Sequence, residues 1–68
     1  MREVSTKLGK NLKRIRTAKK LSQGAIARKL NVHRAYVSGI EHGKRNPTLA
    51  TIDRLAEALG VSVDQLLK

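Results

Sequence analysis

The 68-residue sequence lacks cysteine, phenylalanine and tryptophan, and Tyr36 is its single aromatic residue. Without cysteine, neither disulfide bonds nor thiolate metal sites can form, which fits a reducing compartment. No apolar run approaches the roughly 20 residues of a membrane-spanning helix, and Met1–Lys10 lacks the apolar segment of a signal peptide. We therefore expect residues 1–68 to form one soluble, cytoplasmic domain with a small aliphatic core.

Acidic residues are also scarce, with five against 15 lysines and arginines, for a formal net charge of +10. The excess is unevenly distributed. Residues 1–45 carry 13 of the basic residues and two of the acids, whereas residues 46–68 carry two basic residues and three acids. Solubility alone does not require this segregation. It predicts one surface that binds a polyanion and another that does not.

No arrangement typical of catalysis or metal binding is present. The spacing suggests no Ser–His–acid group or paired carboxylates, and the chain has no glycine-rich phosphate loop. His33 and His42 are nine residues apart, so on a helix they would point about 180° away from each other and could not share a metal ion. We expect no enzymatic activity, no metal, no cofactor and no small-molecule ligand.

What the chain does contain is a stretch, residues 23–41, whose pattern predicts two short helices joined by a tight turn. Its apolar residues form two helical stripes, first Ile26, Ala27 and Leu30, then Val37 and Ile40. Asn31 interrupts the pattern between them, and asparagine tolerates the left-handed conformation that closes one helix and begins a sharp turn. This pattern is typical of a helix-turn-helix.

Three further helices and no strands are expected around this stretch, which makes the fold all-α. After a flexible arm over residues 1–5, the first helix should begin at a Ser5 or Thr6 cap and run to about Lys19. Gly9 inside this helix costs about 1 kcal/mol relative to alanine, which predicts close packing against a neighbouring element. The buried stripe of this helix would consist of Leu8, Leu12 and Ile15.

The remaining helix ends are marked by capping residues. The predicted caps are Ser22 for the second helix, Thr48 for the fourth, and a Ser62–Gln65 capping box for the fifth. The third helix should run from about Arg34 to His42 and end at Gly43, and the fourth should end at Gly60. The inward residues predicted for the fourth helix are Leu49, Ile52, Leu55, Ala56 and Leu59.

The segments LGKNLKRIR, LSQGAIARKL, YVSGIEHGKRNPT and LATIDRLAEALGVSVDQLL together resemble Cro/repressor-type helix-turn-helix regulators, the xenobiotic-response-element family. The resemblance extends from Leu8 to Leu67. It implies a compact five-helix, lambda-repressor-like DNA-binding domain. YVSGIEHGKRNPT is most similar to the small controller proteins of restriction–modification systems, which bind DNA as dimers. Phage repressor domains and antitoxins share much of the same pattern.

The sequence departs from the family pattern in three ways. Asn31 replaces the usual turn glycine, which its left-handed tolerance accommodates. Gly24-Ala25 replaces a pair that is usually polar, which removes negative charge near the expected DNA backbone. His33 stands where Ser, Thr or Asp usually caps the third helix, which predicts a weaker cap and leaves its phosphate contact open.

The outward face of the third helix supplies the candidates for base reading. If this helix enters the major groove, Arg34 is placed for a bidentate contact to guanine, with a phosphate contact as the alternative. Ala35 could touch a thymine methyl group and Ser38 could donate or accept a hydrogen bond; otherwise both are passive surface residues. Gly39 either lets the duplex approach closely or is simply tolerated on an exposed face.

The candidates for phosphate binding are Gln23, His33, Tyr36, Lys44, Arg45 and Asn46. Gln23 begins the second helix, where free N–H groups and the helix dipole favour an anion, and the resemblance implies the same role. Residues 44–46 follow the reading helix directly and would contact the backbone, although a charged run is often only solvated. Tyr36 either packs on the domain or presents its hydroxyl to DNA.

Glu41 is expected to pair with a nearby Arg or Lys in a structural role.

The end of the chain, residues 61–68, is the expected dimerisation helix. A domain this small gains stability from self-association. We assign Leu66 to the core and Val63 and Leu67 to a two-fold dimer contact, which the resemblance also implies; the alternative is that all are core. Such a dimer would place two reading helices about 34 Å apart, matching a palindromic site.

These features predict a sequence-specific transcriptional regulator that binds inverted repeats of double-stranded DNA as a homodimer, with a restriction–modification operon as one candidate target. With no effector domain expected, regulation would follow protein concentration. Two alternatives stay open. The chain could be an antitoxin or phage-type repressor that regulates its own operon, or a basic nucleic-acid binder without sequence preference.

Overall fold

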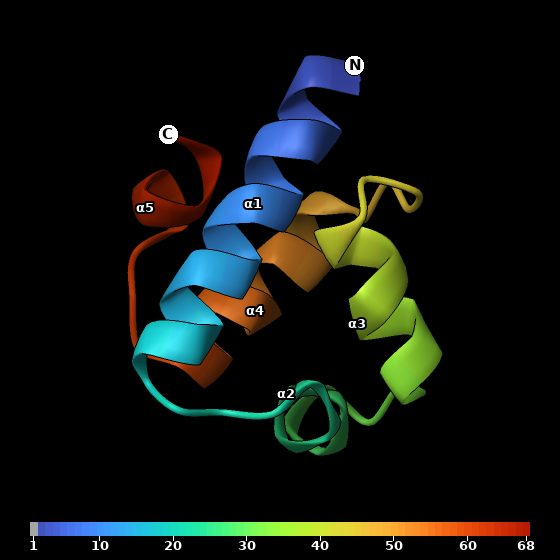
Figure 1. Ribbon diagram of the computed structural model, residues 1–68. Helices are drawn as coiled ribbons and strands as arrows, with labels where there is room; N and C mark the ends of the chain where they lie inside the picture. The colour runs from blue at the N-terminus through green and yellow to red at the C-terminus, as the bar shows by residue number, and fades with distance from the viewer. Residues whose placement is uncertain (1) are drawn as a thin grey trace.

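The computed structural model describes the backbone of residues 2–68 and the side chains of residues 4–68. This part of the chain contains five α-helices and no strand: α1 (Arg2–Ala18), α2 (Gln23–Leu30), α3 (Arg34–Glu41), α4 (Leu49–Leu59) and α5 (Val63–Leu67). The predicted all-α, five-helix fold is confirmed. Figure 1 shows α1 running between α3 and α5, with α4 behind it and α2 beyond its C-terminal end.

The core is aliphatic and receives side chains from all five helices. Its buried members are Leu8, Leu12, Ile15, Ile26, Ala27, Leu30, Val37, Ile40, Ile52, Leu55, Ala56, Leu59 and Leu66. The predicted stripes of the first three helices are therefore confirmed, and so is the assignment of Leu66 to the core. Because these side chains come from every helix, burial of one common core fixes how the helices pack.

Leu49 is the exception, because it was predicted to face inward and is instead 75% exposed. It is the first residue of α4, directly after the Thr48 cap. At 100° per residue it lies about 70° from the centre of the buried stripe formed by the later residues of the helix. Leu49 therefore lies at the edge of the core, where the periodicity alone does not bury it.

The beginning of α1 also differs from the prediction. The flexible arm expected over residues 1–5 is wrong for residues 2–5, because α1 begins at Arg2; Met1 lies outside the described residues. Ser5 is not a cap but a buried residue, 8% exposed, and its hydroxyl donates to Oδ1 of Asn46 at 3.2 Å. This contact with a segment far along the chain occupies Ser5 within the helix, which local capping preference did not predict.

Each of the first four helices is followed by a residue in the left-handed conformation, namely Lys20, Asn31, Gly43 and Gly60, with φ between 58° and 71°. In each case the next residue donates its N–H to a carbonyl five positions back, the pattern of a Schellman motif. Asn31, Gly43 and Gly60 match the prediction, whereas Lys20 was not foreseen. The residues after three of these positions are apolar and pack against the core: Leu21, Val32 and Val61.

The predicted caps can be checked at the other ends. The Ser22 and Thr48 hydroxyls accept from the N–H groups of Ala25 and Thr51, and Ser62 and Gln65 form a complete capping box. His33 makes no side-chain cap bond to α3, in agreement with the weak cap expected there.

Gly9 is where α1 crosses α3. A Cβ at this position would lie 2.7 Å from the carbonyl oxygen of Glu41 and closer still to that of Ile40. The predicted close packing is confirmed, and the obstacle is backbone that cannot move aside. None of the described helices is long and apolar enough to cross a membrane.

Candidate nucleic-acid interface

The helix-turn-helix consists of α2, the turn at Asn31 and α3. Asn31 adopts φ 58° and its N–H bonds back to Arg28, while Val32 bonds back to Ala27. The predicted left-handed turn is therefore present. Five side chains of α2 and α3 are buried in the common core: Ile26, Ala27, Leu30, Val37 and Ile40. Their burial fixes the angle between the two helices and leaves the opposite face of α3 outward.

The four predicted base-reading residues lie on α3 outside its buried stripe. Arg34 and Ala35 are exposed, whereas Ser38 and Gly39 are half-buried. At the C-terminal end of this face, Nδ1 of His42 lies 2.8 Å from the carbonyl oxygen of Ser38 and 3.5 Å from its hydroxyl. A carbonyl only accepts, so His42 Nδ1 carries the proton in this bond, and the Ser38 hydroxyl lies at the edge of hydrogen-bond distance from the same nitrogen.

A buried ion pair holds α3 against α1. Arg16 donates from Nε to Oε2 of Glu41 at 2.5 Å and from Nη2 to Oε1 at 3.1 Å, the bidentate arrangement of the guanidinium fork. Its remaining Nη1 donates to the carbonyl of Leu21 at 2.8 Å. The side chains are 11% and 2% exposed, respectively. The expected structural pairing of Glu41 is confirmed, and its partner is Arg16.

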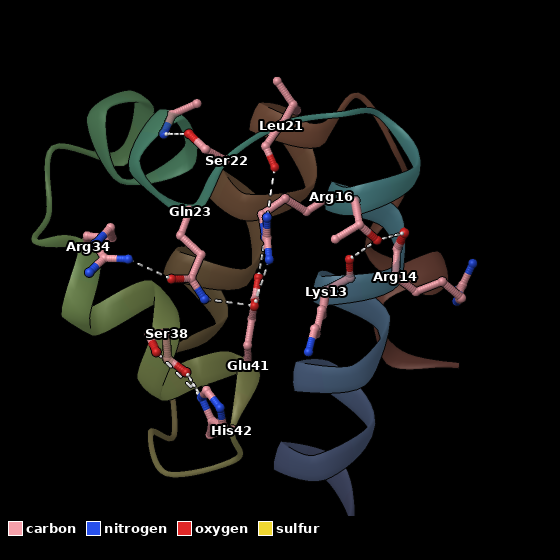
Figure 2. Close-up of polar contacts among 12 residues, drawn as sticks. Lys13, Arg14, Arg16, Leu21, Ser22, Gln23, Arg34, Ser38, Glu41 and His42 are labelled. Atoms are coloured by element: carbon pink, nitrogen blue, oxygen red, sulfur yellow. Dashed lines mark hydrogen bonds and ion pairs between the residues drawn. The ribbon is translucent and has the colours of Figure 1, made fainter.

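Further hydrogen bonds connect this ion pair to the first residues of α2 and α3, as Figure 2 shows. Gln23 donates from Nε2 to Oε1 of Glu41 at 3.0 Å, and Arg34 donates from Nη1 to Oε1 of Gln23 at 3.4 Å. Arg16, Glu41, Gln23 and Arg34 thus form one continuous polar chain. It joins α1 to the first residues of α2 and α3.

The net effect of these neighbours is to lower the pKa of Glu41 below its ordinary value. Burial is the largest single influence and raises the pKa. The hydrogen bonds from Arg16 and Gln23, together with the positive charges of Arg16 and Lys13, outweigh it. The hydrogen bond to Glu41 correspondingly raises the pKa of Arg16. Glu41 is therefore an anion at neutral pH.

Arg45 does not extend away from the domain but folds back over α3. Its guanidinium carbon lies 5.6 Å from the centre of the Tyr36 ring, a cation–π distance. A Cβ on Gly39 would come within 2.8 Å of Arg45 Cγ. Gly39 therefore leaves room for the aliphatic part of the Arg45 side chain. The sequence analysis considered only close approach of DNA as a reason for glycine at this position.

Tyr36 and Arg45 also border a recess next to the reading helix. The recess has a volume of about 480 Å³ and is lined by Asn31, Val32, His33, Ala35, Tyr36 and Arg45. Tyr36 is half-buried and packs against the core, while His33 is exposed. The recess therefore combines predicted base-reading and phosphate-binding residues in one concave surface.

The rest of the basic loop after α3 divides into two roles. Lys44 is exposed and sits directly after the left-handed Gly43. The Asn46 side chain accepts the hydrogen bond from Ser5, which ties the loop to α1. Lys44 and Arg45 thus contact α3, whereas Asn46 contacts α1.

Val63 and Leu67, the predicted dimer residues, are half-buried and pack against the core. Part of each side chain serves its own domain and part remains on the surface. The nearby Asn11 side chain donates to the carbonyl of Leu66 at 2.8 Å, which attaches α5 to α1.

Comparison with known proteins agrees with this geometry. Residues 12–66 match the family described as Helix-turn-helix. The control protein C.MunI of Mycoplasma is 34% identical over 67 residues, which cover 97% of this chain and 90% of that protein. The immunity repressor of Bacillus phage phi105 is 38% identical over 60 residues, and the match spans only 42% of that repressor.

Solved structures give the same result. The controller protein C.AhdI from Aeromonas hydrophila superposes with a TM-score of 0.86 at 42% identity, covering 91% of this chain and 94% of that one. The C.Esp1396I controller tetramer, in complex with its 35-base-pair operator, gives a TM-score of 0.80 at 32% identity, with 96% of each chain covered. The chain therefore belongs to the helix-turn-helix family. It is a DNA-binding regulator homologous to restriction–modification controller proteins.

Sequence reasoning missed three features of this surface. These are the contact of Gln23 with both Glu41 and Arg34, the folding of Arg45 onto Tyr36, and the left-handed Lys20. Only the last had a usable signal, because an apolar residue followed by a capping serine, Leu21-Ser22, often comes after a Schellman turn.

Proposed function

We propose that two copies of this chain bind an inverted-repeat operator and control transcription by occupying it. The observation that carries the proposal is the convergence on one surface of α3, the start of α2 and the basic loop of residues 44–46. The relatives named as controller proteins, one of them crystallised on its operator, support it. We propose a DNA-binding protein rather than an enzyme, acting in the cytoplasm, where the operator would be accessible.

In this proposal α3 lies in the major groove. Arg34 donates both ends of its guanidinium to one guanine, and Ala35 and Ser38 contact neighbouring bases. Exposure of Arg34 and Ala35 supports this assignment, because neither is needed for the core. Gly39 contributes by its lack of a side chain.

Phosphate contacts flank the reading helix. They are proposed for Gln23, His33, Tyr36, Lys44, Arg45 and Asn46. The free backbone N–H groups at the start of α2 would contact the same phosphate as Gln23, and no acidic residue in the first turn of α2 would repel it. These contacts set register and affinity, whereas sequence preference comes from α3.

The dimer is proposed to form through Val63 and Leu67 of the α5 region, residues 61–68. Both side chains remain partly exposed after their own core is complete, which supports a second apolar contact. A two-fold axis there would pair each residue with the same region of the partner and would space the reading helices by about one DNA turn.

The target we favour is a restriction–modification operon, on the strength of the controller proteins among the relatives. The match to a phage immunity repressor supports a second candidate, a phage-type repressor acting on its own promoter. The two share operator binding and differ in the genes controlled.

Selection of bound fragments from random DNA at about 150 mM salt, near physiological ionic strength, tests the proposal directly. We expect an enriched inverted repeat with half-site centres about 10 base pairs apart. Binding without any enriched motif would contradict sequence-specific regulation and would favour a non-specific basic binder. The enriched motif would also locate the promoter and so decide between the two targets.

A further inference from the structure

A third polar side chain follows Arg34 and Ser38 along the outward side of α3. This is His42, which is exposed at the C-terminal end of the helix. We propose that His42 binds a DNA phosphate and that it does so only as the imidazolium, so that each subunit takes up a proton when it binds DNA near neutral pH. This inference rests on the major-groove docking of α3 proposed above.

The place of His42 on α3 suits a contact with the DNA backbone rather than with the bases. Arg34, Ser38 and His42 are four residues apart from one another, so they lie along one side of the helix. At about 1.5 Å per residue, His42 lies about 12 Å beyond Arg34, and the major groove is itself about 12 Å wide. With Arg34 at the base edges, His42 therefore lies near the sugar–phosphate strand that borders the groove.

The hydrogen bond between His42 and the Ser38 carbonyl decides which ring nitrogen carries the proton. Nδ1 lies 2.8 Å from that oxygen and 3.5 Å from the Ser38 hydroxyl, as the dashed lines in Figure 2 show. Because a carbonyl only accepts, the neutral ring has its proton on Nδ1, and Nε2 is an acceptor without a hydrogen. The two ring nitrogens point in divergent directions, so Nε2 is directed away from the Ser38 carbonyl.

This tautomer determines what His42 can bind. The oxygens of a DNA phosphate only accept hydrogen bonds, and so does Nε2 of the neutral ring, so the two repel each other. Protonation turns Nε2 into a positively charged N–H donor and leaves the bond from Nδ1 to Ser38 in place. The phosphate contact then becomes a charge-assisted hydrogen bond. Imidazole gains and loses this proton within the physiological pH range.

The charges near His42 are mostly positive. Lys13 of α1 lies close enough to Glu41 to lower the pKa of that carboxyl, and Lys44 follows His42 by two positions. Glu41 precedes His42, but its side chain is 2% exposed and is bound by Arg16. A DNA phosphate is therefore the group that would neutralise a protonated ring. By linkage, protonation and DNA binding favour each other.

His33 provides an internal comparison, because it is the other histidine of the chain and also a proposed phosphate contact. It is exposed, and its side chain makes no cap bond to α3. A neutral ring without such a bond can carry its proton on either nitrogen and can donate it to a phosphate. His33 therefore does not need a second proton to bind, whereas His42 does.

The test measures affinity for the inverted repeat obtained in the selection above, with wild type, His42→Gln, His42→Arg and His33→Gln. The pH is varied from about 5.5 to about 8, where histidine titrates, at about 150 mM salt. Glu41 remains ionised over this range, because its pKa lies below its ordinary value of 4.5. Wild type and His42→Gln share every other titrating group, so the difference between their pH profiles isolates His42.

We expect wild type to bind more tightly at the acidic end of the range. Neutralising one phosphate is worth about fivefold in affinity at about 150 mM salt, or up to about 30-fold for the two subunits. The slope of log affinity against log salt should also steepen on acidification, by up to about 0.9 per subunit. His33→Gln should retain both effects.

The two His42 variants should lose this part of the pH dependence for different reasons. The amide of His42→Gln donates without a charge, so at the alkaline end this variant should bind at least as tightly as wild type. His42→Arg keeps its charge at every pH and should bind tightly throughout. Circular dichroism melting at each pH establishes that folded proteins are compared.

The ¹⁵N chemical shifts of the histidine rings check the chemistry directly. In the free protein, the neutral ring of His42 should show its proton on Nδ1. In the DNA complex, the ring should stay protonated to a higher pH than in the free protein. A neutral ring with its proton on Nε2 would remove the premise of the inference.

Two binding results would also overturn it while operator binding stands. Equal pH profiles for wild type and His42→Gln would show that His42 takes up no proton. Wild-type binding that weakens on acidification only when His42 is present would mean that neutral Nε2 accepts from a base amino group instead. If the selection enriches no motif, the proposed function fails. The same comparison on a duplex of arbitrary sequence then still decides the role of His42, because phosphate contacts carry no sequence information.

Discussion

α3 and α5 are both short helices, yet they differ in how far local interactions stabilise their ends. α5 has five residues, a complete capping box at Ser62 and Gln65, an acid in its first turn and one buried side chain. α3 has eight residues and no side-chain cap bond, and it has neither an acid in its first turn nor a base in its last. Local side-chain bonds therefore cap α5 in addition to its contacts with α1 and the core, whereas α3 has no such cap and depends on contacts from elsewhere in the chain.

The difference follows from what each helix is proposed to do. The start of α3 is proposed to face DNA through Arg34 and His33, and no side chain caps it. Its position is instead set from behind, by Gly9 and by the Arg16–Glu41 pair. Substitutions at the α1 residues that contact α3 should therefore change the position of α3 more than substitutions in the residues that flank α3 in the sequence.

The largest effect is expected for Arg16→Met, which leaves Glu41 buried without its partner. Removing one member of a buried pair costs about 3–5 kcal/mol, against a total stability of roughly 3–10 kcal/mol for a domain of this size. Urea unfolding should show a lower midpoint or an unfolded protein. Arg16→Lys keeps the positive charge but not the bidentate guanidinium, so it should lower the stability by less than Arg16→Met. As a control, Arg28→Met replaces an exposed arginine and should change the stability by less than about 0.5 kcal/mol.

Acidification tests the same pair without removing it. The folded-state pKa of Glu41 lies below its ordinary value of 4.5, so the pair's stabilisation is fully present above that pH. It is lost as pH falls through the lower folded-state pKa, because the unfolded chain takes up the proton first. Melting temperatures measured from pH 7 to pH 3 should fall in the acid range. The melting temperature of Glu41→Gln should fall less steeply over the same pH range. If the wild type and Glu41→Gln show the same pH dependence, ionisation of Glu41 does not contribute to stability.

Gly9→Ala should destabilise the protein by about 1–3 kcal/mol, although alanine is the better helix former. The added methyl group meets the carbonyls of Ile40 and Glu41, which belong to the α3 backbone. Gly24→Ala is the matched control, since a Cβ there meets atoms no closer than 3.7 Å. Thermal unfolding should show Gly24→Ala as neutral or stabilising. Equal behaviour of the two variants would mean that α1 and α3 do not pack as described.

The smallest effects come from exchanging the caps of the two helices. Ser62→Ala should cost about 1 kcal/mol, while His33→Ser should add a cap to α3 and stabilise by a similar amount or less. Thermal unfolding and operator binding should then move in different directions for His33→Ser, because the substitution removes the phosphate contact proposed for His33. A gain in both would show that His33 makes no such contact.

Sequence patterns located most of the elements, because they depend on residues close together in the chain. The buried stripes of α1, α2 and α3 follow helical periodicity, and Ser22, Thr48 and Ser62 follow capping chemistry. The same reasoning failed at Leu49, where the stripe continues beyond the edge of the core, and at Ser5, which resembled a cap and is buried within α1.

By itself the sequence determined the all-α class, the helix-turn-helix, and the turns at Asn31, Gly43 and Gly60, since each rests on interactions within a few residues. Only the tertiary structure decided which arginine pairs with Glu41, because Arg16 is 25 positions away and several other cations were equally eligible. It also decided the orientation of the Gln23 amide and the position of Arg45 over Tyr36. These depend on where the common core brings separate helices together, which no local pattern encodes.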